Sequence, residues 1–432
     1  MPHPRRTLHL LLVAFFALSA AAHADVIKVP GDYDNLQVAV NNATHGDVIL
    51  IASGYHSAGP VEIADKALTL VVDQGSQATV PQVRIRDLAP DHHVVLRGLG
   101  ADGQAFPLGP NAEALLIENC QGRVTVEGST FRGADGWQGF VHPGGYAGAS
   151  VENSTSVAFS HCLLIGGRGE NTLGDFAPPG PGASGVEASD SDVSVAFCEL
   201  SGGDGGHANG DHDYIYGSSG GSGIWQVGGT LYVTGALLAG GDGGNGSCDW
   251  DFLSGFVCGG GGAGGDGLTL VNATAYHHGL AFAPGQGGFS AEEGEPPAPD
   301  GVLVDGPDAT LLPAAPRDFT VPAVKREGQT AAFVFSGEPG DSALVWIAMA
   351  PRWVLLPAHE GVFLVDNGAP FNLLIPLAPT GLGGDLSVSF TMPALPPAFV
   401  ALPIHAQGIF QTGSGQFLLG PSSVLTVVDA SF

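Results

Sequence analysis

The sequence contains few basic residues. Lys and Arg together number 14 in a chain of 432 residues, against 42 Asp and Glu, which gives a formal net charge of -28 at pH 7. Two of the arginines, Arg5 and Arg6, stand at the extreme N-terminus. A surface with this balance repels polyanions and attracts cations such as calcium. The composition therefore argues against nucleic acid and anionic membranes as partners unless a metal ion bridges them.

Long apolar runs are also lacking once the first residues are passed. The chain opens with "MPHPRRTLHLLLVAFFALSAAAHA", in which two arginines, an apolar run and the small-residue site Ala22-His23-Ala24 follow one another. This order is typical of a secretory signal peptide, and its apolar core is too short to span a bilayer. We therefore expect residues 1–24 to be a signal peptide cleaved near Ala24. The mature protein is predicted to be secreted, or located at the cell surface or in the periplasm, without a membrane span.

Motifs for nucleophilic or phosphate chemistry are missing as well. No Ser or Cys stands at catalytic spacing, and the glycine-rich stretches are not followed by the lysine and helix of a P-loop. The cysteines number five. Cys248 and Cys258 lie in one loop, "GSCDWDFLSGFVCGG", and we predict a disulfide between them, since such a bond braces an insertion in an exported chain. The others lie beside strand-like segments and are expected to be buried, small apolar residues: Cys120, Cys162 and Cys198.

Glycine and proline, by contrast, are abundant, with 68 and 31 residues, while the hydrophobic content of 44% favours a folded, mostly β protein. An internal repeat organises much of this glycine. The copies "VTVEGSTFRGADG", "VAFSHCLLIGGRG", "VSVAFCELSGGDG" and "LYVTGALLAGGDG" align at Gly133, Gly166, Gly202 and Gly240, which are 33, 36 and 38 residues apart. The apolar positions align too, in three columns: Val124, Val157, Val193 and Leu231; Val126, Phe159, Val195 and Val233; Phe131, Leu164, Leu200 and Leu238.

Stacked columns of this kind predict a solenoid, because each unit buries only one face and needs a neighbour. The coils resemble a right-handed parallel β-helix of the pectin-lyase-like type. The stretch "VIKVPGDYDNLQVAVNNATHGDVILIASGYHS" is similar to the N-terminal segment of secreted bacterial β-helix proteins, in which a short amphipathic helix, here about residues 33–44, covers the first coil. We expect the β-helix, with this cap, over residues 25–315. The glycine-rich insertions should project from one edge, where glycine permits positive φ and tight turns.

Residues 316–432 differ in pattern. Alternating strands and proline turns, as in "GDSALVWIAMAP" and "GDLSVSFTMP", predict a separate antiparallel β-sandwich. The stretch resembles C-terminal modules of secreted bacterial surface proteins. Its expected role is to cap the solenoid or to attach the protein to another component.

Register also predicts which residues of the coils face solvent. Beside the buried columns stand small or neutral residues with one carboxylate: Thr125, Ala158, Ser194 and Tyr232, then Glu127, Ser160, Ala196 and Thr234. A β-helix lyase needs carboxylates that gather calcium and a basic residue, and a hydrolase of this fold needs clustered aspartates. This sheet offers neither set.

The neighbouring sheet offers more. Aligning "LLIENC", "ASVENS", "SGVEAS" and "SGIWQV" with a one-residue deletion places Glu118, Glu152, Glu187 and Trp225 in one outward column. Strands about 4.8 Å apart would bring these carboxylates close enough to raise one another's pKa or to share a calcium ion. The hypothesis is a calcium-binding or carbohydrate-contacting stripe with Trp225 as a stacking surface. The alternative is a row of solvated glutamates.

The loop "GGDGGHANGDHDYIYG" is a second candidate for metal. It concentrates Asp204, His207, Asp211, His212 and Asp213, residue types that bind calcium or zinc, although the same residues also serve simply to keep a loop soluble. A single calcium nonapeptide, "GGAGGDGLT" with Asp266, predicts no site alone because such repeats work in tandem.

The sequence thus favours an exported, non-catalytic β-helix protein at the surface or envelope, which binds carbohydrate or calcium. Polysaccharides or envelope components are the expected partners, and calcium is the cation that its acidic groups suggest. The alternative is an enzyme, a polysaccharide lyase or glycoside hydrolase with an acidic site at Glu118, Glu152 and Glu187. A purely structural or adhesive spacer is a third class. The fold itself does not decide among them.

Overall fold

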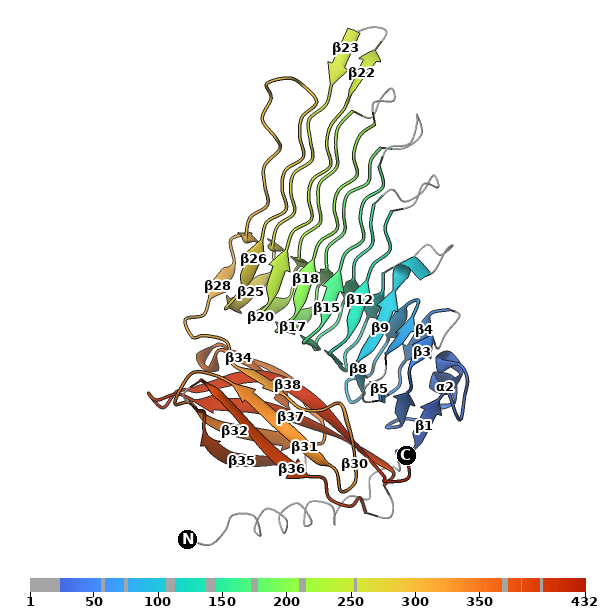
Figure 1. The fold of residues 1–432 in the computed structure, drawn as a ribbon, viewed down its shortest axis with the longest axis vertical. Coiled ribbons are helices and arrows are strands. Elements are labelled where there is room, and N and C mark those ends of the chain that lie inside the picture. The colour runs from blue at the N-terminus through green and yellow to red at the C-terminus, as the bar shows by residue number, and fades with distance from the viewer. Residues whose placement is uncertain are drawn as a thin grey trace.

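Three long parallel sheets form the N-terminal part of the chain, with one strand of each coil in each sheet (Figure 1). A computed structural model describes residues 24–55, 59–73, 77–105, 113–136, 144–171, 178–209, 215–251, 255–366, 372–381, 383–396 and 399–432. Residues 1–23 of the predicted signal peptide therefore lie outside the described residues. The parallel β-helix that the repeat predicts is present.

Sheet A has 10 strands, and sheets B and C have eight each. Sheet A contains β1 (Val26–Val29), β2 (Val48–Ile51), β5 (Leu68–Val72), β8 (His93–Arg97), β11 (Arg123–Glu127), β14 (Val157–Ser160), β17 (Asp192–Ala196), β20 (Thr230–Thr234), β25 (Thr274–His278) and β28 (Ala309–Leu311). Sheet B contains β3 (Gly54–Tyr55), β6 (Ala78–Val80), β9 (Leu99–Asp102), β12 (Thr130–Arg132), β15 (Leu163–Ile165), β18 (Glu199–Ser201), β21 (Leu237–Ala239) and β26 (Ala281–Ala283). Sheet C contains β4 (Val61–Ala64), β7 (Val83–Arg86), β10 (Leu115–Glu118), β13 (Ala149–Glu152), β16 (Val186–Ser189), β19 (Ile224–Val227), β24 (Leu268–Val271) and β27 (Val304–Asp305). A short 3-10 turn, η1 (Gly103–Ala105), follows β9.

The apolar columns form the core of the solenoid. Val124 pairs in register with Val157, Val126 with Phe159, and so on along the stack, so each predicted column is confirmed. These side chains are almost completely buried. Helix α2 (Leu36–Asn42) covers the first coil as predicted, with Leu36 buried in the same core.

Residues after the last coil form the sandwich. One sheet contains β29 (Asp318–Thr320), β31 (Thr330–Ser336) and β36 (Asp385–Thr391). The other contains β30 (Val324–Arg326), β38 (Phe417–Val428), β37 (Ala401–Gln411), β32 (Ser342–Ala348) and β35 (Asn372–Pro379). A hairpin, β33 (Pro351–Leu356) and β34 (Gly361–Val365), with the turn η3 (Pro357–His359) between its strands, packs beside them. The pairing is antiparallel except between β30 and β38, which run parallel.

The sandwich lies along the outer face of sheet A, across the side of the solenoid (Figure 1). At one end, Val48 and Val71 of sheet A pack with Val324, and at the other, Tyr232 packs with Val362. The prediction that this face meets solvent is therefore wrong. All eight side chains that were expected outside are buried: Thr125, Ala158, Ser194, Tyr232, Glu127, Ser160, Ala196 and Thr234. Small neutral side chains on this face permit the close approach of a second layer.

The glycine-rich insertions project from the solenoid side by side and in the same direction (Figure 1). We call this arrangement the glycine array. Its outgoing segments are residues 133–136, 166–171, 202–209, 240–247 and 284–289, and its returning segments are 144–148, 178–185, 215–223, 259–267 and 297–302. Outgoing and returning segments are joined by rows of backbone hydrogen bonds, one of which, with distances of 2.8–3.2 Å, runs through Ala183, Gly203, Gly221, Gly241, Gly265, Gly285 and Gly301.

Positive φ is not the reason for the glycines of these extended segments, although Gly294, in the turn between the last two segments, has the predicted positive φ of 92°. No glycine in the described part of the array has a backbone in the left-handed region. A Cβ atom on Gly203 would instead lie 1.9 Å from the carbonyl oxygen of Gly167, and one on Gly241 would lie 1.9 Å from that of Gly203. In the outgoing segments that begin at Gly202 and Gly240, side chains stand at the third position of successive Gly-Gly-X triplets: Asp204, His207, Asp242 and Asn245. This matches extended chains with three residues per turn packed side by side, where only glycine fits at the contact.

Candidate functional site

The outer face of sheet C carries the predicted glutamates, but they do not form one column. Glu118 pairs with Glu152 across β10 and β13, whereas Glu187 pairs with Ser150 on one side and with Trp225 on the other. The prediction of a single column is therefore wrong. In β16, Ser189 and not Glu187 continues the column of Glu118 and Glu152, so Glu187 lies two residues away from it. A shift of two keeps every side chain on its own face, so the apolar pattern could not reveal it. The face carries two acidic groups in neighbouring columns.

A further glutamate, which the sequence analysis missed, lies beside them. Glu113 stands two residues before β10, and its Oε2 atom is buried without a hydrogen-bond partner. Burial raises the pKa of the Glu113 carboxyl, and the charges of Glu187 and Glu152 add to this. Burial also raises the pKa of Glu187, against hydrogen bonds from Ser184 that lower it. Burial and the charge of Glu113 raise the pKa of Tyr146. Glu113 precedes its strand, so strand alternation gave no signal for it.

Trp225 is the exposed aromatic residue in this sheet, with 40% of its surface accessible. It stands between Glu187 of β16 and Thr269 of β24, each one strand spacing of about 4.8 Å away. Polar groups continue beside it, since the hydroxyl groups of Ser222 and Thr269 lie 2.8 Å apart and Thr269 donates to Asp266 at 3.1 Å. A flat apolar ring thus lies within a row of hydroxyl and carboxylate groups. We call these residues the Trp225 row: Glu187, Ser222, Trp225, Asp266 and Thr269.

The predicted metal residues Asp204 and His207 lie in the glycine array, where both have backbone partners. Asp204 accepts a hydrogen bond from the N–H of Asp242 at 3.1 Å and pairs with Arg168 at 3.2 Å. Nδ1 of His207 accepts from the N–H of Asn245 at 2.8 Å. Each side chain therefore ties one coil to the next. The other predicted ligands lie outside the described residues: Asp211, His212 and Asp213. Metal binding here remains a prediction.

No group of three or more His, Cys, Asp or Glu side chains is arranged for a metal ion within the described part of the chain. Asp266 of the lone nonapeptide uses its two carboxylate oxygens on the N–H of Val302 and the hydroxyl of Thr269. Its carboxylate thus serves the packing of neighbouring coils.

The disulfide prediction is confirmed at the far end of the array. Strands β22 (Cys248–Asp251) and β23 (Gly255–Cys258) form an antiparallel hairpin (Figure 1). In it, Cys248 pairs with Cys258, and their sulfurs are bonded. The bond ties the two strands at the base of the hairpin. The other cysteines are free and buried in the solenoid core, as expected: Cys120, Cys162 and Cys198.

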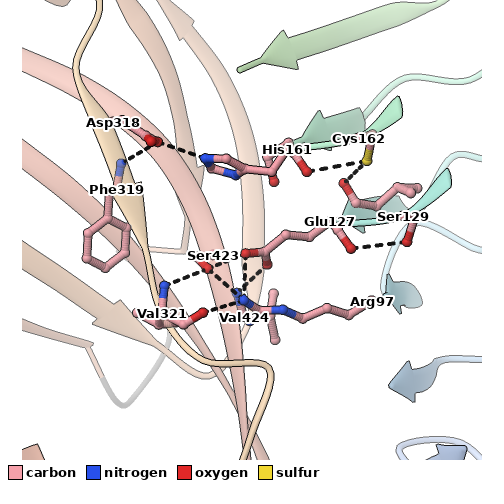
Figure 2. A network of polar contacts seen from close by, with 12 residues as sticks. Arg97, Glu127, Ser129, His161, Cys162, Asp318, Phe319, Val321, Ser423 and Val424 are labelled. Carbon is pink, nitrogen blue, oxygen red and sulfur yellow. Dashed lines mark hydrogen bonds and ion pairs between the residues drawn. The ribbon is translucent and has the colours of Figure 1, made fainter. Parts of the chain in front are cut away.

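A buried ion pair lies between sheet A and the sandwich (Figure 2). Glu127 is only 2% exposed, and its Oε1 lies 2.8 Å from Nη2 of Arg97. The same carboxylate accepts hydrogen bonds from the hydroxyl of Ser423 and, at 2.9 Å, from the N–H of Val424. The carboxylate of Glu127 therefore joins sheet A to strand β38 of the sandwich.

A second polar contact crosses the same interface. Nε2 of His161 lies 2.9 Å from Oδ1 of Asp318 (Figure 2). Burial lowers the pKa of His161, but the hydrogen bond and the charge of Asp318 outweigh it, so the pKa is raised. The sandwich is therefore held to sheet A by charged as well as apolar contacts.

A third contact makes the interface sensitive to acid. His93 of sheet A packs edge-on against His405 of the sandwich, with ring centroids 5.7 Å apart. Burial lowers the pKa of His93 to about 4, with the charges of Arg123 and His92 adding to the shift, and it lowers the pKa of His405 to about 3, with the charges of His93 and Arg123 adding to it. Both side chains are therefore neutral when folded at pH 5, where the unfolded chain already binds protons.

We expect the free energy of unfolding to fall as the pH drops from about 6.5 toward 4, by about 1.4 kcal/mol per pH unit for each histidine. The double variant His93→Phe/His405→Phe should lose most of this slope. Urea unfolding followed by tryptophan fluorescence at a series of pH values measures it. An unchanged slope in the double variant would show that other groups, such as the interface carboxylates, control the acid response.

No protein-family model matches the sequence, and a search of curated proteins finds no match. Among the described residues, no helix has both the length and the apolar character needed to cross a membrane. The fold and the geometry of these sites are thus the basis on which a function can be proposed.

Proposed function

We propose that this chain is an exported, non-catalytic β-helix protein of the pectin-lyase-like type that binds polysaccharide on the outer face of sheet C. The observation that carries the proposal is Trp225, an indole that is 40% exposed on a flat sheet surface within a row of hydroxyl and carboxylate groups. Sugar rings have apolar faces and polar rims, so they fit a ring of this kind with hydrogen-bonding groups beside it. A role at the cell surface or envelope follows from the predicted signal peptide.

The net charge of the chain limits the class of polysaccharide that can bind beside Trp225. With a net charge of -28, the surface repels anionic polymers, and Glu187 stands next to Trp225. A neutral polysaccharide is therefore the expected ligand of the Trp225 row. Calcium would extend the range to acidic polymers, because the neighbouring carboxylates of Glu118 and Glu152 are oxygen ligands of the type that calcium takes.

Binding to a panel of neutral and acidic polysaccharides, with calcium and with chelator, tests the proposal. Trp225→Ala should weaken binding about tenfold, since loss of an aromatic contact costs about 1.4 kcal/mol. Leu237→Ala is the matched control, because Leu237 is 38% exposed on sheet B. Equal polysaccharide binding by Trp225→Ala and Leu237→Ala would show that the Trp225 row is not the binding site. An unchanged calcium affinity in Glu152→Gln would contradict the calcium hypothesis.

A polysaccharide lyase or glycoside hydrolase is the second candidate. Its support is the group of Glu113, Glu187 and Glu152, in which burial raises the pKa of the Glu113 and Glu187 carboxyls. Release of reducing or unsaturated ends from any polysaccharide, lost in Glu187→Gln, would favour the enzyme. Binding without release would favour the non-catalytic protein.

A further inference from the structure

A polar cleft lies at the N-terminal end of sheet C, between helix α2 and strands β4 and β7. Its volume is about 530 Å³, which falls in the range of small-molecule sites, about 300 to 1,000 Å³. Gln37 and Asn41 of the helix line one wall, and Glu62 and Arg84 of the strands line the other. No residue of the Trp225 row takes part in it.

The guanidinium group of Arg84 is the distinctive feature of this cleft. Its Nε donates to Oε1 of Gln82 at 2.8 Å, which fixes the plane of the group. Its two terminal nitrogens have no hydrogen bond or ion pair with any described residue. Glu62 stands directly beside Arg84 in the register, yet its carboxylate pairs with Arg86 instead. An arginine fork is therefore left open although a carboxylate is one strand away.

The opposite wall supplies a second donor and a fixed positive charge. The side-chain oxygen of Asn41 accepts a hydrogen bond from Gln37 at 2.7 Å, and no described residue accepts a hydrogen bond from its amide nitrogen. Nζ of Lys66 donates to the carbonyl groups of Val40, Asn41 and Ala43 at 2.9–3.0 Å, and so carries a charge without a carboxylate partner. Lys66 also anchors the C-terminal end of the helix wall.

The charges of the cleft differ from those of the molecule. Two cations, Lys66 and Arg84, and one carboxylate, Glu62, line it, and Glu113 lies near enough for the charge of Arg84 to lower its pKa, while the chain as a whole is at -28. The carboxylate of Glu62 is held by Arg86 at 2.6 Å. Screening limits the repulsion from distant acidic groups to about 10 Å at 0.1 M salt, so the local charges decide what the cleft accepts.

We propose that this cleft binds a small carboxylate that also carries hydroxyl groups, such as a sugar acid. The planar fork of Arg84 matches a carboxylate in bidentate geometry. The amide of Asn41 and the remaining oxygen of Glu62 are a donor and an acceptor for hydroxyl groups. The site does not rest on the proposed function, because four strand spacings, about 19 Å in all, separate β7 from the strand of Trp225.

Titration calorimetry of the purified protein with glucuronate, glucose and glucose 6-phosphate tests this site. Glucuronate should bind saturably and at least tenfold more tightly than glucose. Arg84→Met, which keeps the length of the side chain but removes the fork, should weaken glucuronate binding at least tenfold. Asn41→Ala should weaken it to a smaller extent from the other wall. Circular dichroism of each variant confirms that the fold is retained.

Arg132→Met is the control, since Arg132 is a half-exposed arginine of sheet B that pairs with Asp135 away from the cleft. It should leave glucuronate binding unchanged, and Trp225→Ala should do the same. Three results would overturn the assignment: no saturable binding of glucuronate by the unaltered protein, equal binding by Arg84→Met, or a preference for glucose 6-phosphate. Loss of polysaccharide binding in Trp225→Ala with glucuronate binding intact would separate the two proposals.

Discussion

Replacing Gly203 with alanine is expected to disrupt the glycine array while the solenoid core stays folded. The new Cβ would lie 1.9 Å from the carbonyl oxygen of Gly167 and 2.4 Å from its carbonyl carbon, and both are backbone atoms that cannot turn away. The segments must then separate, which breaks the hydrogen bonds from Gly203 to Ala183 and from Gly221 to Gly203. We expect a local cost of at least about 3 kcal/mol.

Hydrogen exchange read by mass spectrometry measures this effect segment by segment. Peptides from the array should exchange faster in Gly203→Ala, and peptides from sheet A should not. Gly260→Ala is the matched control, because Gly260 lies in the same array and a Cβ there meets nothing within 4 Å. That variant should exchange like the unaltered protein. Equal protection of the array in Gly203→Ala would mean that close chain contact is not what requires glycine.

Removing the carboxylate of Glu127 should have the largest effect at the domain interface. Glu127→Leu leaves the guanidinium of Arg97 buried without its counter-charge, in a position where Nη1 already has no partner. It also removes the acceptor of Ser423 and Val424. We expect a loss of about 3–5 kcal/mol in the free energy of unfolding.

The double variant Glu127→Leu/Arg97→Met supplies the control, because two apolar side chains leave no unpaired charge. It should recover most of the stability, since replacing both members of a buried pair is often neutral or stabilising. Urea unfolding of the single and double variants completes the cycle. Equal losses in the single and double variants would show that shape, and not charge, holds Glu127 in place.

The solenoid was predictable from the sequence because its information is local and repeated. Val124, Val157 and Val193 recur at the same place in each coil, and a buried column needs only that recurrence. The disulfide was predictable for a similar reason, as Cys248 and Cys258 stand in one loop. The position of Glu187 was not, because strand alternation is blind to shifts of two residues.

The covering of sheet A depends on residues distant in sequence. Val424 donates a hydrogen bond to Glu127 although the two residues are 297 positions apart in the sequence, and no local sequence pattern predicts such a contact. A signal was nevertheless present, since a chain with 42 acidic residues places only uncharged side chains in the middle column of the outer side of sheet A: Thr125, Ala158, Ser194 and Tyr232. The Gly-Gly-X triplets after Gly166, Gly202 and Gly240 were a second signal. Their period of three indicates packed extended chains more strongly than it indicates turns.

The glycine array also has a thermal consequence. Its interior positions are glycines held by backbone hydrogen bonds, so separating the segments exposes peptide groups and little apolar surface. Exposure of polar groups lowers the heat capacity, whereas exposure of apolar groups raises it. The stability of the array should therefore not weaken on cooling, as apolar contacts do. Near the freezing point, the array would persist while the apolar cores of the solenoid and the sandwich lose part of their driving force.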